Sequence, residues 1–466
     1  MRLHLRASSN WPRLVLLIAV LILGRPVRAQ LGFDYIVPPT PKLIKAARIL
    51  DVRTGTYRLN QGILTDGERI KEIGPWEDVK GHAPNGVETI DLGQATLLPG
   101  LIDCHAHLLS SMEGRLDGGE TITISVTEMS PSLRALMGAH SAKQVLESGI
   151  TSVRNVGHSG VDGDIALRDA INGGFVPGPR VQASGRKIAP VGGQAVYLQA
   201  GIAEQILPLE FLTVSGPDEA RKAVRTNFAF GADFIKIVVD AGAGPYWHTR
   251  YLSLEDARAV VEDAHRLGMK VAAHAVDRAA IQTAIDASVD SVEHGDEATN
   301  EQLQQIKDKG IFLDATDIFT NGRLTEYFSQ FLAPTPEFVT GIKKADEEST
   351  ALSRDRLQRA MKIGVKIVMG SDMWFFWPGK GRGETTLYEL ESLSKEGMPN
   401  IEIIRSSTIN AADLMGWSDR VGEIAAGKFA DLIAVDGDPL ADITTLEHAR
   451  FVMKGATVVK NEVGTH

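Results

Sequence analysis

The sequence predicts an α/β protein: a (β/α)8 TIM barrel with a small β-sandwich domain assembled from N- and C-terminal segments. Three observations lead to this prediction. Strand-like and helix-like segments alternate through the middle of the chain. Short strands with glycine-containing turns occur at both of its ends. The 466 residues are enough for one large domain and a small second one.

The predicted barrel strands are short apolar runs. Most are followed by a helical stretch with Asp, Ser or Thr at its start and Gly at its end, as in SLEDARAVVEDAHRLG at 253–268. A doubly wound open sheet is the alternative, but no G-x-G-x-x-G motif follows the first strand. The predicted strands cover 96–104, 150–156, 180–185, 234–239, 270–275, 290–294, 311–316 and 366–371.

The two end segments resemble each other in pattern. DGERI at 66–70 and KGATVV at 454–459 each predict a hairpin turn between short strands. Neither segment is long enough to form a core alone, so we expect them to pair. The predicted domains are therefore residues 30–95 and 416–466 for the two sandwich parts, with the barrel at 96–415.

The first 29 residues predict a signal peptide. Three arginines precede the apolar run LVLLIAVLILG, and Val27 and Ala29 are the small residues before the expected cleavage site. An uncleaved anchor is the alternative, but the run is shorter than the roughly 20 residues that span a bilayer. We expect export to the periplasm or medium with no stable anchor after cleavage; an intact Met1 in the exported protein would contradict cleavage.

Composition narrows the function classes. The net charge is -10 and basic clusters are absent, which argues against nucleic acid as the partner. Cys104 is the single cysteine, so an intramolecular disulfide and a cysteine-based zinc site are excluded. We expect Cys104 to be a buried structural residue that points away from any metal. Metal ligands would have to be His, Asp, Glu or a modified Lys.

Potential metal ligands lie at the carboxyl ends of predicted strands one, four, five, six and eight, where a (β/α)8 barrel carries its active site. Each has a structural alternative: a histidine satisfied in the core, a lysine whose head reaches water, an aspartate that caps a turn. Their joint occurrence favours a metal centre, and four histidines with one aspartate exceed a single tetrahedral site. The residues are His105, His107, Lys236, His274, His294 and Asp372.

These motifs resemble the amidohydrolase superfamily. The resemblance is carried by GLIDCHAHL at 100–108, the strand-four lysine, the two later histidines, GSD at 370–372 and VGEIAAGKFADLI at 421–433. Within the superfamily, the chain is most similar to the branch that includes imidazolonepropionase, Xaa-Pro and Xaa-Arg dipeptidases and the fungal ochratoxin-hydrolysing amidase. Imidazolonepropionases typically lack the strand-four lysine and hold one metal, so Lys236 points to the dipeptidase and amidase group.

The resemblance implies a role for each residue. His105, His107 and Asp372 would bind one divalent ion, and His274 and His294 a second, both expected to be Zn²⁺. Lys236 would be carboxylated and bridge the two ions. Asp372 would also be the catalytic base in hydrolysis of an amide or peptide C–N bond, in a dipeptide, an N-acyl amino acid or an aryl amide of the ochratoxin type.

Two other functions stay open: a mononuclear cyclic-amide hydrolase or deaminase with unmodified Lys236, and an exported binding protein without catalysis.

Candidate substrate-binding residues lie in the loop after strand four. They are Tyr246, His248 and Arg250, and the Arg250 guanidinium could bind a substrate carboxylate. Relatives often carry a histidine after the strand-three glycine pair, where this chain has Gln194. The aromatic run at 374–377 would line a pocket or pack against a second subunit, and we expect a homo-oligomer.

Overall fold

The computed structural model describes residues 39–110, 118–194, 198–242, 249–330, 335–375 and 377–464. The predicted signal peptide lies outside these ranges and stays a prediction. The protein is an α/β structure with one mixed sheet built from both ends of the chain and parallel strands in between. Among the helices in the described ranges, none combines the length and apolar character that crossing a bilayer requires.

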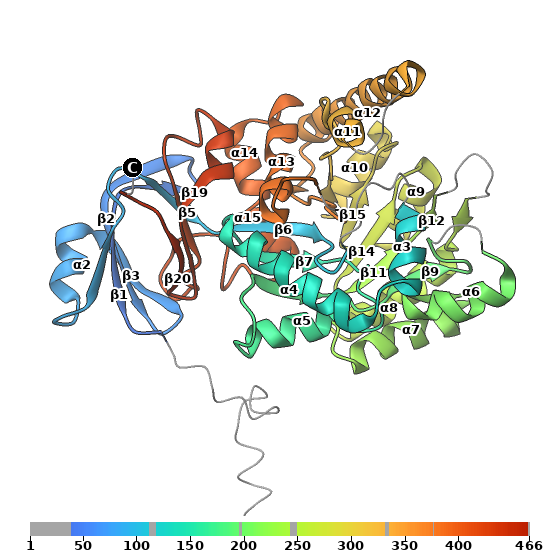
Figure 1. Ribbon diagram of the computed structural model, residues 1–466, viewed down its shortest axis with the longest axis horizontal. Helices are drawn as coiled ribbons and strands as arrows, with labels where there is room; N and C mark the ends of the chain where they lie inside the picture. Colours follow the sequence, from blue (N-terminus) through green and yellow to red (C-terminus); the bar gives the residue numbers. More distant parts are fainter. Residues whose placement is uncertain are drawn as a thin grey trace, which may run out of the picture. The chain divides into compact units, whose positions relative to one another are not determined.

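An eight-stranded sheet joins the two ends of the chain. Its N-terminal strands, blue in Figure 1, and its C-terminal strands, red, lie in the order β20-β19-β18-β5-β1-β2-β3, with β4 paired to β1. Both predicted hairpins are confirmed: Asp66 pairs with Arg69, and Lys454 with Thr457. The strands are β1 (Lys42–Asp51), β2 (Thr56–Asp66), β3 (Arg69–Pro75), β4 (Glu88–Asp91), β5 (Thr96–Pro99), β18 (Leu432–Val435), β19 (Ala449–Lys454) and β20 (Thr457–Asn461).

The parallel strands form a three-stranded sheet, β6-β7-β8, and a seven-stranded sheet, β10-β9-β11-β14-β15-β16-β17. Every one of the eight predicted barrel strands has a counterpart among them. Strand three is followed by a further short strand, β9, where the sequence predicted a loop. The bounds are β6 (Leu101–Ala106), β7 (Ile150–Asn155), β8 (Arg180–Ala183), β9 (Lys187–Pro190), β10 (Phe211–Val214), β11 (Ile235–Val238), β14 (Val271–Ala275), β15 (Ser291–His294), β16 (Phe312–Asp314) and β17 (Ile367–Val368). A short antiparallel pair, β12 (Asp240–Ala241) and β13 (Arg250–Tyr251), follows β11.

Hydrogen bonds connect β6 to the segment that follows β17. The Cys104 amide donates to Met369 O at 2.8 Å, and the Asp372 amide donates to His105 O at 2.8 Å. Ala106 forms an isolated parallel bridge with Met373. The strand that carries His105 therefore lies beside the segment that carries Asp372.

The Cys104 side chain is buried in an apolar cluster with Ile102 and its neighbours, as predicted, and burial raises the pKa of its thiol.

Helices follow most of the parallel strands (Figure 1). The sequence signals locate their ends well: the Ser253 hydroxyl caps α8 by accepting from the Asp256 amide, and Gly364 in the left-handed conformation ends α12. The Thr335 hydroxyl caps the start of α12 by accepting from the Phe338 amide. The bounds are α2 (Trp76–His82), α3 (Gly118–Thr127), α4 (Pro131–Glu147), α5 (Gly163–Asn172), α6 (Ala200–Ile206), α7 (Pro217–Ala229), α8 (Leu254–Arg266), α9 (Arg278–Ala287), α10 (Asn300–Asp308), α11 (Arg323–Ser329), α12 (Pro336–Ile363), α13 (Arg382–Lys395), α14 (Asn400–Ser406) and α15 (Ile409–Leu414), with short 3-10 helices η2 (Leu207–Leu209) and η3 (Ile443–His448).

Phe375 and Trp377, two residues of the aromatic run after β17, pack inside the chain. Phe375 and Trp377 are buried in one cluster with Tyr327 and Phe328 of α11 and Tyr388 of α13. The Tyr327 and Phe375 rings meet edge to face, with centroids 4.6 Å apart. These aromatic residues therefore fix the loop that follows Asp372 to the helices beside it.

Candidate metal centre

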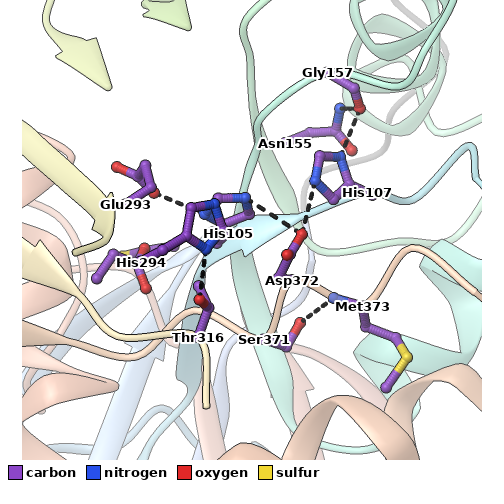
Figure 2. Close-up of polar contacts among 12 residues, drawn as sticks. His105, His107, Asn155, Gly157, Glu293, His294, Thr316, Ser371, Asp372 and Met373 are labelled. Atoms are coloured by element: carbon purple, nitrogen blue, oxygen red, sulfur yellow. Dashed lines mark hydrogen bonds and ion pairs between the residues drawn. The ribbon is translucent and has the colours of Figure 1, made fainter. Parts of the chain in front are cut away.

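Three of the predicted ligands converge at the ends of β6 and β17. Asp372 Oδ1 lies 3.1 Å from His107 Nε2 and 3.4 Å from His105 Nε2 (Figure 2). His294 joins them, because it offers a nitrogen that lies within 4.8 Å of ligand atoms of both His105 and Asp372. His105 lies in β6 and His107 directly follows its last residue, and both rings point toward Asp372, as the sequence predicted.

Hydrogen bonds on the far side of each ring determine which nitrogen faces this cluster. His107 Nδ1 donates to Gly157 O at 2.9 Å, and His105 Nδ1 lies 2.8 Å from the carboxylate of Glu293. Both partners are acceptors, so Nδ1 of each ring carries the proton, and in a neutral ring Nε2 is then a lone pair. Burial lowers the pKa of His105 well below its usual range and keeps it neutral.

This arrangement fits a bound cation. In the neutral rings two lone pairs face the Asp372 carboxylate, which also has only lone pairs to offer. Three acceptors directed at one another repel unless a positive charge lies between them. Neutral imidazole and carboxylate are the ligands that Zn²⁺ and similar divalent ions prefer.

The other two histidines form an adjoining group. The rings of His274 and His294 have centroids 4.6 Å apart. His294 Nδ1 lies 2.8 Å from the Thr316 hydroxyl, which itself donates to Ala315 O, so His294 Nδ1 is the donor and Nε2 is available. His274 Nε2 lies 3.7 Å from Asp240.

Lys236 completes the predicted set. It is 2 % exposed, and within the described ranges its Nζ has no hydrogen-bond partner. Burial lowers its pKa to about 8. Its charge is among the causes that lower the pKa of His105, His274 and His294. Lys236 pairs with Ala272, two residues before His274 on the neighbouring strand, so the two side chains share a face of the sheet. A buried amine without a partner is costly, which indicates a ligand or modification not present in the amino-acid chain.

The backbone is strained at these positions. His294 and Asp372 are in the left-handed region, with φ of 70° and 47°. Thr316, the partner of His294, also has positive φ, at 57°. Residues with side chains adopt this conformation at a cost of about 1–3 kcal/mol, and such residues concentrate at functional sites.

A layer of buried charges lies beside the histidines. The Arg154 guanidinium donates to both Glu293 oxygens, at 2.8 and 2.9 Å, and to Asp314 at 3.4 Å. Glu293 in turn orients His105. His105, Glu293 and Asp314 also have ligand atoms within 4.8 Å of one another, but the Arg154 guanidinium pairs with both carboxylates, and burial raises the pKa of Asp314 well above its usual range. We therefore interpret it as an ion-pair network that positions His105 rather than as a second metal site.

The proposed substrate residues are only partly described. Tyr246 and His248 lie outside the described residues. Arg250, the first residue of β13, is half-buried. It packs so closely on the turn after β9 that a Cβ atom added to Gly192 would lie only 2.8 Å from Arg250 Cδ. Arg250 therefore lies beside the strand-three turn that contains Gln194.

Five charged or titratable residues near the histidines were not predicted from the sequence. Arg154, Glu293 and Asp314 lie inside apolar strands, the same signal that singled out Lys236. Lys187, at the start of β9, is 2 % exposed, and burial lowers its pKa to about 7. His158 stacks on His107 with centroids 4.4 Å apart, and no local sequence pattern indicated it.

Known proteins match this chain over most of its length. The family model of the amidohydrolase family covers residues 96–459. The chain belongs to the amidohydrolase family. Ochratoxinase from Aspergillus niger is 28% identical over 392 residues, 78% of this chain and 75% of the relative. An imidazolonepropionase from Clostridium tetani is 23% identical over 405 residues, 81% of this chain and 84% of that protein.

A solved structure of a Xaa-Pro dipeptidase with bound methionine in its active site is also similar to this amidohydrolase. It has a TM-score of 0.74 and 31% identity and covers 90% of this chain and 99% of its own. These relatives imply a TIM-barrel-type α/β fold. Membership of the family and these relatives make the protein a hydrolase that acts on C–N bonds, and the family generally binds metal ions.

Proposed function

We propose that this amidohydrolase holds two divalent ions and hydrolyses the amide or peptide bond of small substrates that carry a free carboxylate. Candidate substrates are Xaa-Pro and other dipeptides, N-acyl amino acids and aryl amides of the ochratoxin type. The names of the Xaa-Pro dipeptidase and ochratoxinase relatives support these classes. The observation that carries the binuclear proposal is the buried Lys236 Nζ, which has no partner in the described ranges and shares a sheet face with His274, while its charge also lowers the pKa of His105.

His105, His107 and Asp372 would hold one ion, and His274 and His294 the other, with Zn²⁺ as the expected metal. Lys236 would bridge them after carboxylation. Its neutral amine, which burial favours, forms a bond to the carbon of CO₂ and releases a proton, and the product is a carbamate with two oxygens. A costly buried cation thereby becomes an anion that matches two cations.

The chemistry supplied by bound divalent ions is activation of water and polarisation of the substrate carbonyl. Asp372 accepts the proton of the attacking water and donates it to the leaving nitrogen. Its backbone amide is fixed by the hydrogen bond to His105 O, so the carboxylate keeps its place beside both histidines. Arg250 would bind the substrate carboxylate, together with Tyr246 and His248 of the same loop.

Two measurements test this proposal. Metal analysis of protein purified with Zn²⁺ should give two equivalents per chain, and a screen of dipeptides and N-acyl amino acids should show hydrolysis that chelation abolishes. One equivalent with activity on cyclic amides would favour the mononuclear hydrolase or deaminase. A metal-loaded protein that is inert across the panel would favour an exported binding protein.

We further propose that the parallel strands close into a (β/α)8 barrel at 96–415 and that residues 30–95 and 416–466 form a sandwich domain. The hydrogen bonds from Cys104 and Asp372 between β6 and the end of β17 support closure. The shared eight-stranded sheet supports the second domain. A crystal structure in which β6 and β17 are separated would contradict the barrel.

A further inference from the structure

Lys187 is a second buried lysine that the proposed metal chemistry does not use. Ile188 pairs with Ile237 in the parallel ladder of β9 and β11, so Lys187 and Lys236 are neighbours on adjacent strands and share a face. Two cations side by side repel, and burial adds to the cost of each. Lys236 is accounted for as a bridging ligand, whereas Lys187 needs a different explanation.

The Lys187 side chain is held along its whole length. A Cβ at Gly157 would lie 2.6 Å from its Cγ, so its stem packs directly on that glycine. Its Nζ lies 5.1 Å from the centroid of the Phe211 ring and donates to Gln194 Oε1 at 2.6 Å. The lysine therefore connects the loop behind His107 with the turn that carries Gln194.

The bond to Lys187 determines how the Gln194 amide is turned. Lys187 Nζ is the donor in this bond, so the amide oxygen of Gln194 faces it and the two N–H donors of the amide point elsewhere. Across the part of the chain that the structure describes, no hydrogen bond uses Gln194 Nε2. Gln194 is half-buried, and its turn also contains Gly192, on which Arg250 packs.

We propose that Lys187 is a positioning residue that fixes the Gln194 amide with its N–H groups toward the substrate, where they bind the substrate carboxylate beside Arg250. Arg250 packs on the turn that carries Gln194, so its cation and the amide donor together match the two oxygens of a carboxylate. This inference rests on the proposed function and adds the residues that would select substrates with a free carboxylate. The positioning of Gln194 would also explain why a buried lysine, Lys187, lies at the start of β9.

The test compares kcat and KM for a Xaa-Pro dipeptide and for the same compound with its carboxylate converted to an amide. Gln194→Glu removes the N–H donors and keeps the size of the side chain. Lys187→Met keeps the stem on Gly157 and removes the ammonium. Lys222→Met, an exposed residue on α7, is the matched control. Metal content and thermal unfolding are measured for each variant.

We expect Gln194→Glu to raise KM for the free acid by about 10–100-fold, the effect of losing a hydrogen bond to a charged group, with kcat nearly unchanged. The amide-capped substrate should change by less than about 3-fold. Lys187→Met should change KM in the same direction by about 3–10-fold, and the double variant should be no worse than Gln194→Glu alone, because both act through one contact. Metal content should stay at the wild-type level.

Equal losses for the two substrates would overturn the proposal, and so would independent effects that multiply in the double variant. Loss of metal or lowered thermal stability in Lys187→Met without a change in selectivity would show a structural role instead. If the wild type hydrolyses neither these compounds nor any other member of the panel of dipeptides and N-acyl amino acids, the proposed function fails. If the wild type is active, Lys236→Ala is inactive and the Lys187 and Gln194 variants are normal, this inference alone fails.

Discussion

The eight-stranded sheet and the parallel strands bury opposite kinds of side chain. In the terminal sheet the interior is apolar, with residues such as Ile44 and Phe451, while its charges pair at the surface, as Lys45 does with Asp91. The parallel strands bury Arg154 and Glu293 at 3 % and 0 % exposure. The difference indicates that the terminal sheet contributes mainly stability. In the parallel strands, buried charges lower the stability but position the side chains of the candidate metal centre.

The strongest test of this contrast is Lys236→Ala. Loss of the bridging group should reduce hydrolysis by more than about 1000-fold, over ~4 kcal/mol of barrier, and should lower bound metal. The metal-free protein should unfold at the same temperature or higher, because the substitution removes a buried amine with no hydrogen-bond partner in the described ranges. Turnover and metal content equal to wild type would contradict the bridging role.

A second variant, His274→Ala, tests one of the two proposed ion sites by itself. His274→Ala should lose about one metal equivalent of two, because the remaining ligands belong to the group around Asp372. It serves as the control for Lys236→Ala, which should affect both equivalents. Equal loss of both ions in His274→Ala would show that the assignment of ligands to ions is wrong.

Arg154→Met tests the buried ion pair beneath His105. Removal of the guanidinium leaves Glu293 and Asp314 without their cation, which should lower the free energy of unfolding by about 3–5 kcal/mol. Because Glu293 orients His105, metal affinity should also fall by about 10–100-fold. Urea unfolding and metal titration measure the two effects, and a variant that loses neither would mean that the network is dispensable.

Ile44→Ala tests the terminal sheet, where we expect a loss of stability without a loss of metal or activity. Ile44 is fully buried between Ile63 and Ile90, so the cavity should cost about 2–4 kcal/mol of unfolding free energy. At temperatures where the variant is folded, kcat/KM and metal content should match the wild type. A selective change in turnover would show that this sheet takes part in the chemistry.

The sequence predicted the strands, and it predicted that side chains of His105, His107 and Asp372 meet, because both depend on local pattern and on the rule that parallel strands end at one edge. The neighbouring residues were harder. Glu293 adjoins a predicted ligand and Arg154 interrupts an apolar strand, so buried charge could have indicated both. The contacts of Lys187 with Gly157 and Gln194 depend on how loops from two strands pack, and neither spacing nor composition contains that information.

The smallest predicted effect concerns the exposed pair of Lys45 and Asp91, whose side chains are 38 % and 54 % exposed. Lys45→Met should lower the free energy of unfolding by less than about 1 kcal/mol, in contrast to Arg154→Met, because water screens the pair.

The contribution of this pair depends on pH. The hydrogen bond from Lys45 is the largest of the causes that lower the pKa of Asp91. This contribution is therefore present above the unfolded-state pKa and lost as pH falls through the lowered folded-state value. The difference between wild type and variant in unfolding free energy should be measurable at pH 7, shrink in 0.5 M salt and vanish at strongly acidic pH. A loss as large as that of Arg154→Met would break the contrast between the two regions, because an exposed pair would then stabilise the protein as much as a buried one.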